Sequence, residues 1–286
     1  MNHSLTASSP VSKRLSPRKM AFITGTLLLT STGFICRILG FFYRIFMSRT
    51  IGAEGLGIYN MVHPIFSICF AVCAGSIQTA LSQYLAANQT RGRAVFRTGL
   101  VIAMGMSFLL AWVIYGNAGF LAEKLLLEPR CAPYLPVMAV SVPFAALHAC
   151  INGYYYGMQK ARVPAFSQVA EQVIRMGAVF LIAGIWLDSG REITVSLAVY
   201  GHLIGEMASA AFTLFCLGFF PPSGRKEERN IRKVIPLSFG ASAAPLMALA
   251  LPLMGNRLIL NVLGSAEAIW IPNRLMSSGL TNSEAL

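Results

Sequence analysis

The chain has 286 residues and a net charge of +12, and 55% of its residues are hydrophobic but only 12% are charged. Soluble domains carry about 25% charged residues, so the composition excludes a disordered chain, a disulfide-stapled secreted module and an ordinary soluble enzyme. A membrane-spanning helix needs about 20 mostly apolar residues. The chain is therefore expected to fold as an all-α, polytopic transmembrane helix bundle.

Seven apolar stretches are long enough to span a bilayer. We place them at 21–48, 58–86, 95–117, 134–157, 164–187, 195–219 and 235–262. The chain is then expected to divide into a cytoplasmic basic tail (1–20), a six-span N-terminal lobe (21–220), a cytoplasmic basic loop (221–234), a seventh span that begins a second lobe (235–263) and an outer amphipathic tail (264–286). The first apolar run continues through Arg37 and Arg44 without a cleavage site, which indicates a retained span rather than a signal peptide.

Lysine and arginine alternate in density from loop to loop. One side of the membrane receives fourteen of the 23 basic residues and the other side receives five. By the positive-inside rule the N-terminus is cytoplasmic and the protein is a multi-pass protein of the cell membrane. This alternation is not that of a nucleic-acid-binding patch, so no nucleic acid is expected as a partner. The lipid bilayer is the expected partner, with the basic loops near anionic head groups.

No motif for enzymatic chemistry is present. The chain contains no HExxH, GxSxG or P-loop sequence, and its one aspartate, Asp188, is in an outer loop. Five of the six cysteines fall in apolar spans, which is typical of small packing residues. We therefore expect no enzyme activity, no cofactor, no metal site and no structural disulfide.

An internal repeat relates the first loop to the end of the chain. At an offset of 213 residues, 53–60 (AEGLGIYN) aligns with 266–273 (AEAIWIPN). Six spans separate the two copies, so both would cross the membrane in the same direction, as a parallel repeat requires. This favours one complete repeat followed by the first span of a second.

Charged residues inside the spans are the main functional signal, because each costs about 2.5–3.5 kcal/mol at mid-bilayer. They are Arg37, Arg44, Glu171, Arg175, Glu206 and Arg257, joined by the titratable His63, His148 and His202. Glu171 and Arg175 are four residues apart and could form an internal ion pair, and His202 and Glu206 share that spacing.

Four embedded arginines against two glutamates leave an excess positive charge of +2. A positive cavity favours an anionic cargo, and arginine binds phosphate oxygens in pairs. We expect substrate binding by Arg37, Arg44, Arg175 and Arg257, and charge balance or ion coupling by Glu171 and Glu206.

Several stretches carry a resemblance to a known family. They are 36–46 (CRILGFFYRIF), 51–59 (IGAEGLGIY), 153–159 (GYYYGMQ), 171–175 (EQVIR) and 271–275 (IPNRL). Across residues 20–286 the chain resembles the stage V sporulation protein B family. These are polysaccharide-biosynthesis membrane proteins of the multidrug/oligosaccharidyl-lipid/polysaccharide exporter superfamily.

The resemblance implies two six-span lobes that move a polyprenyl-pyrophosphate-linked saccharide or peptidoglycan-type precursor by alternating access, in a sporulation-related setting. Arg37 matches an arginine in the first span that is essential in related flippases, and Arg44 lies one residue from a second such position. The chain stops where an eighth span would begin, so we expect an incomplete flippase. It would be either a fragment from a frameshift or incomplete gene, or half of a pair whose second lobe is separately encoded. The alternatives are a cation or drug antiporter of the same superfamily and a non-transporting fragment.

Overall fold

The computed structural model describes residues 17–88, 92–222 and 239–277, and within this part every regular element is helical. The long helices are α1 (Pro17–Phe70), α2 (Ser76–Ala87), α3 (Gly92–Gly116), α5 (Leu135–Gly157), α6 (Arg162–Asp188), α7 (Ser196–Phe219) and α9 (Phe239–Ser277). Short pieces lie between them: η1 (Ala71–Gly75), α4 (Ala118–Phe120), η3 (Leu121–Leu125) and η4 (Pro129–Cys131). The all-α prediction is confirmed, and six of these helical runs are long and apolar enough to cross a membrane.

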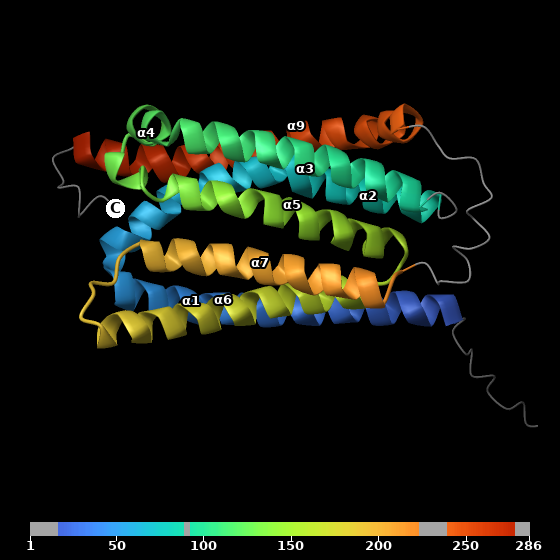
Figure 1. Ribbon diagram of the computed structural model, residues 1–286, viewed down its shortest axis with the longest axis horizontal. Helices are drawn as coiled ribbons and strands as arrows, with labels where there is room; N and C mark the ends of the chain where they lie inside the picture. The colour runs from blue at the N-terminus through green and yellow to red at the C-terminus, as the bar shows by residue number, and fades with distance from the viewer. Residues whose placement is uncertain (1–16, 89–91, 223–238, 278–286) are drawn as a thin grey trace, which may run out of the picture.

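The six runs differ from the expected seven because the first two spans are counted as one run, in which two helices meet at a kink. That run, Ile23–Ala87, has 65 residues and would measure about 100 Å if straight, against a hydrocarbon core of about 30 Å. Its direction changes at Gly52, whose φ of 76° and ψ of 171° are non-helical. Glycine adopts this backbone conformation without steric strain, whereas residues with a Cβ do not. In Figure 1 the chain runs one way in dark blue and returns in lighter blue and cyan.

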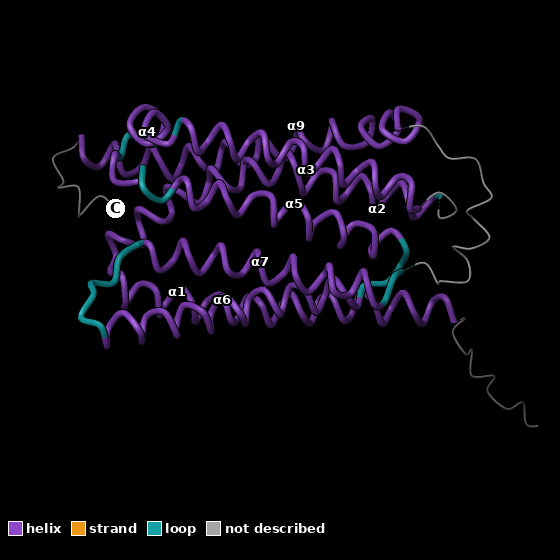
Figure 2. Tube along the Cα trace, viewed as in Figure 1, coloured by secondary structure: helices purple, strands orange, loops and turns teal. Residues whose placement is uncertain are grey.

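The helices form two layers (Figures 1 and 2). One layer holds the first half of α1 with α6 and α7, and the other holds α2, α3, α5 and α9. The second half of α1 passes from the first layer to the second, and α5 packs against α7 between them. Exposed apolar side chains cover the outer faces, with Trp112 on α3 74% exposed. Such faces suit contact with acyl chains rather than water.

Two pairs of glycines, each four residues apart, allow helices to pack closely. On α7, a Cβ at Gly205 would lie 2.8 Å from Nε of Arg175, and a Cβ at Gly201 would overlap Val179. On α5, a Cβ at Gly153 would lie 2.7 Å from the carbonyl oxygen of Gln78, and Gly157 meets α2 in the same way. These small-residue contacts, typical of membrane helices, hold α6 against α7 and α5 against α2.

The helix ends differ from two expected boundaries. α1 begins at Pro17, inside the expected tail 1–20, because proline is well suited to the first turn of a helix. α9 continues to Ser277, whereas the seventh span was expected to end at 263. Hydropathy marks where apolar residues stop, but the residues that follow, such as Ala266 and Glu267, still favour a helix. The expected loop 221–234 and the rest of both terminal segments lie largely outside the described residues.

Candidate functional site

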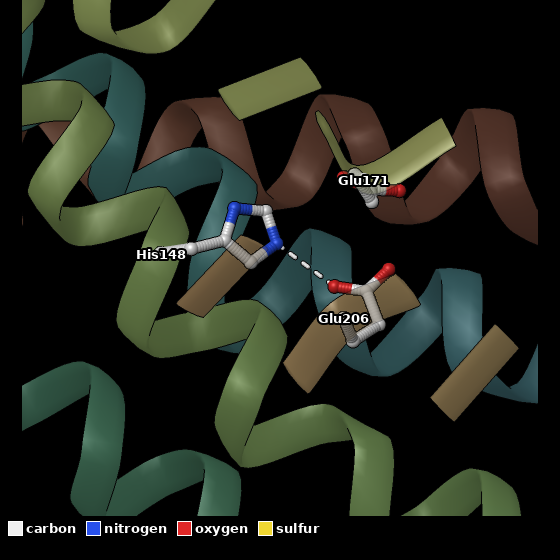
Figure 3. A group of neighbouring side chains, drawn as sticks. All are labelled: His148, Glu171 and Glu206. Atoms are coloured by element: carbon white, nitrogen blue, oxygen red, sulfur yellow. Dashed lines mark hydrogen bonds and ion pairs between the residues drawn. The ribbon is translucent and has the colours of Figure 1, made fainter. Parts of the chain in front are cut away.

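A cluster of charged side chains lies between the two layers, where α5, α6 and α7 meet (Figure 3). His148 of α5 contacts Glu206 of α7, with 2.8 Å between Nε2 and Oε2. Arg175 of α6 donates through Nη2 to Oε1 of Glu171, and the same nitrogen lies 3.8 Å from Oε1 of Glu206. His148 is 9% exposed and Glu206 is 5% exposed. These four residues are called the central cluster below.

Histidine and tyrosine side chains extend the central cluster toward α1. His202, one turn before Glu206 on α7, is 3% exposed and places Nε2 3.9 Å from Oε1 of Glu206. Neither ring nitrogen of His202 has a hydrogen-bond partner among the described residues. Its ring centroid lies 5.6 Å from that of His63 on α1, and Nδ1 of His63 lies 3.3 Å from Oγ of Ser67.

The formal charges of the central cluster do not balance. Two carboxylates face one guanidinium, so the cluster carries a net charge of −1 when its histidine is neutral. One atom each of His148, Glu171 and Glu206 lies within 4.8 Å of the others, a spacing that a metal ion could bridge. Arg175 already donates to Glu171 and lies beside Glu206, however, and a fixed cation at that place opposes a divalent metal.

Arg37 and Arg44 lie on the first half of α1, and neither forms an ion pair with the central cluster among the described residues. They are seven residues apart and so point from the same side of the helix, and both are exposed. Arg44 is near enough to interact electrostatically with Tyr59 and His63. The surrounding exposed side chains are apolar, among them Phe34, Phe41 and Phe42. Two guanidinium groups therefore lie on an otherwise apolar face.

Arg257 lies in a third place, where α9 packs against η1 and α2. Its Nη2 donates to Oγ1 of Thr79 over 2.9 Å. Its guanidinium group occupies the space beside Gly75 that a Cβ would fill. The contacts thus place the four arginines in three different surroundings: Arg37 and Arg44 together, Arg175 among acids, and Arg257 at the α2–α9 contact.

A charged clamp joins the short helices at one end of the bundle to α1. Arg130 contacts Oε1 of Glu54 at 2.5 Å through Nη1 and both carboxylate oxygens of Glu128 at 2.9 and 3.1 Å. Hydrogen bonds to Glu128 and then to Glu54 raise the pKa of Arg130. Next to it, burial raises the pKa of the Cys131 thiol to about 12. All six cysteines lie in the described part of the chain and are free thiols.

Local spacing predicted one contact of the central cluster and missed another. The pairing of Glu171 with Arg175 was expected from their separation of four residues and is confirmed. The contact of His148 with Glu206 joins residues 58 apart, and no local pattern reveals it. The sequence offered one signal: each is a titratable residue at the middle of an apolar span, where a partner is needed.

These features define a helical, multi-pass membrane protein with charged groups buried between its helices. Residues 22–279 match the family described as polysaccharide biosynthesis protein. Because the match covers most of the sequence, the chain belongs to the polysaccharide biosynthesis protein family.

Three proteins from Bacillus subtilis (strain 168) are similar to this chain. It is 29% identical to stage V sporulation protein B over 93% of this chain and 52% of that protein. It is 18% identical to sporulation protein YkvU over 93% of this chain and 58% of that protein. It is 23% identical to lipid II flippase MurJ over 64% of this chain and 37% of that protein. The chain thus spans about half the length of the first two relatives, and no solved structure matches it.

Proposed function

We propose that this chain is part of a membrane flippase that moves a lipid-linked saccharide or peptidoglycan-type precursor across the cell membrane. The observation that carries the proposal is the pair of exposed arginines, Arg37 and Arg44, on one side of a membrane-spanning helix. A guanidinium group facing only acyl chains would be strongly disfavoured. A lipid-linked pyrophosphate, anionic at its head and apolar in its tail, matches both the arginines and the apolar residues around them.

Membership of the family supports this assignment. One relative bears the name lipid II flippase, and two others are named as sporulation proteins. We therefore propose the same class of cargo for this chain. We also propose that its N-terminus lies in the cytoplasm. We propose that Arg175 and Arg257 also bind the substrate, and that Glu171 and Glu206 provide charge balance or ion coupling.

The roles within the set follow from the contacts. Arg37 and Arg44 are exposed and therefore make the first contact with a pyrophosphate. Arg175 is held by Glu171, so it can reach an anion only if that contact loosens. Arg257 anchors α9 to α2 through Thr79 and contributes positive potential from the other layer.

Binding of a pyrophosphate lipid tests the proposal without requiring transport. The purified chain in nanodiscs is titrated with undecaprenyl pyrophosphate, with Arg37→Gln and Arg44→Gln as variants. Each charge-assisted contact contributes about 1.5–3 kcal/mol, so each variant should bind at least about tenfold more weakly. Arg49→Gln is the matched control, since Arg49 is also exposed on α1 but points from a different side. Equal affinity for all four proteins would contradict the proposal.

The alternative, a cation or drug antiporter, predicts the opposite preference. A lipophilic cation such as tetraphenylphosphonium should then bind saturably, and removal of Arg37 should strengthen its binding. The flippase assignment predicts no saturable binding of this cation to the wild-type chain.

A further inference from the structure

When His148 is neutral, the central cluster holds one more negative charge than positive charge, so one further positive charge would balance it. Within the part of the chain that the structure describes, Arg175 is the one arginine or lysine that forms an ion pair with Glu171 and Glu206. Arg44 interacts electrostatically with Tyr59 and His63. Its side chain is exposed, however, and it forms no ion pair with the cluster among the described residues. An unbalanced charge is strongly disfavoured in an apolar interior.

The geometry shows where one further positive charge fits. His148 already lies 2.8 Å from Glu206, and an imidazolium donor there would form a charge-assisted hydrogen bond. We propose that His148 and Glu206 form a binding site for one exchangeable proton, held between Nε2 of His148 and Oε2 of Glu206. With the proton bound, the cluster has two negative and two positive charges and is neutral.

A second observation, independent of the acidic pair, points to the same site. His202 is 3% exposed, has no hydrogen-bond partner among the described residues and places Nε2 3.9 Å from Oε1 of Glu206, the oxygen not bonded to His148. Beyond it lies His63, with a ring separation of 5.6 Å, and then Ser67 at 3.3 Å from His63. These side chains form a line of polar groups from the cluster to α1.

Every neighbouring element contributes groups that face this proton. α5 contributes His148, α6 contributes Glu171 and Arg175, and α7 contributes His202 and Glu206. The titratable or charged groups of α1 on this side are Cys36, Tyr43, Arg44, Tyr59 and His63. Arg175 disfavours a metal ion at this place but leaves Oε2 of Glu206 to His148, so the observations favour a proton.

The site depends only on these contacts, and its use to drive a transport cycle rests on the proposed function. A failure of the proton site can be distinguished from a failure of the proposed function. If Arg37→Gln and Arg44→Gln do not change pyrophosphate binding, the cargo is wrong, but the ionisation of His148 is unaffected. If His148 is not protonated, the proton site is wrong, whatever the chain binds.

The experiment measures the ionisation of His148 by nuclear magnetic resonance. The full 286-residue chain carries ¹³C,¹⁵N-histidine in lipid nanodiscs, and His148→Gln identifies the signal. At neutral pH His148 should be mostly imidazolium in the wild type, and its imidazolium fraction should fall at least about tenfold in Glu206→Gln. Glu54→Gln is the matched control, because it makes the same change at a carboxylate that contacts Arg130 outside the central cluster, and it should leave His148 charged.

Two results would overturn the proposal. One is a neutral His148 in the wild type at neutral pH, and this measurement stands even if a variant does not fold. The other is a His148 signal that responds to NaCl or ZnCl₂ at fixed pH, because it would assign the site to a metal ion.

Discussion

Nε2 of His148 lies 2.8 Å from Oε2 of Glu206, and this contact joins α5 in one layer to α7 in the other. Both residues lie at most 9% exposed among apolar helices. The contact therefore has a structural effect as well as the proton-binding role proposed for it.

Removing one partner of this contact should destabilise the fold more than removing both. His148→Leu leaves the Glu206 carboxylate buried without its imidazole and should lower the free energy of unfolding by about 2–4 kcal/mol. In the double variant His148→Leu/Glu206→Leu, Arg175 and Glu171 remain balanced, so stability should return toward that of the wild type. Thermal unfolding in one detergent measures all three proteins, together with Glu206→Leu. A double variant with the summed loss of the two single variants would show that the residues do not act as a pair.

Close packing of α6 on α7 should depend on Gly205. A Cβ added there would lie 2.8 Å from Nε of Arg175 and 3.2 Å from its Cβ. Gly205→Ala should therefore destabilise the protein by about 1–3 kcal/mol and displace Arg175 from Glu171. Gly177→Ala on α6 is the matched control, since a Cβ at Gly177 meets nothing within 4 Å. Equal unfolding temperatures for the two variants would contradict this packing.

Cys131 should react slowly with thiol reagents although it lies outside the long helices, at the end of η4. Burial raises the pKa of its thiol to about 12, against about 8.5 for an exposed cysteine. Below its pKa, the thiolate fraction increases about tenfold per pH unit. In a chain with Cys131 as the sole cysteine, labelling by a water-soluble maleimide at pH 8 should be at least about a hundredfold slower than at an exposed Arg191→Cys reference.

The pH dependence gives a second readout for the same thiol. Between pH 8 and pH 10 the reference rate should level off, because its thiol passes its own pKa. The Cys131 rate should continue to increase over that range. Similar rates and similar profiles for the two cysteines would show that Cys131 is exposed.

The sequence predicted the helical class and most helix positions, because hydropathy over about 20 residues depends only on local composition. It also predicted the Glu171–Arg175 pair, which needs only the helical period. Gly52 shows the limit of this reasoning. The sequence predicted a boundary between two spans there. It did not predict that the chain would reverse through one non-helical residue with helix on both sides of it.

The candidate site was predicted less well, since it depends on which helices face one another. The four arginines were expected to act together, but the contacts divide them among an exposed face of α1, the central cluster and the α2–α9 contact. Whether they bind a substrate stays a prediction. The contact of His148 was missed because its partner comes from another helix. The contact of His202 with Glu206, by contrast, was indicated by their separation of four residues on α7.

The most direct test of the proposed cargo compares lipids that differ only in the head group. The wild-type chain in nanodiscs is titrated with undecaprenol, undecaprenyl phosphate and undecaprenyl pyrophosphate at one salt concentration. If Arg37 and Arg44 bind phosphate oxygens, affinity should rise in that order, with at least about tenfold between the alcohol and the pyrophosphate. Equal affinity for the three lipids would show that the chain holds only the polyprenyl tail, and would contradict an anion-binding role for these arginines.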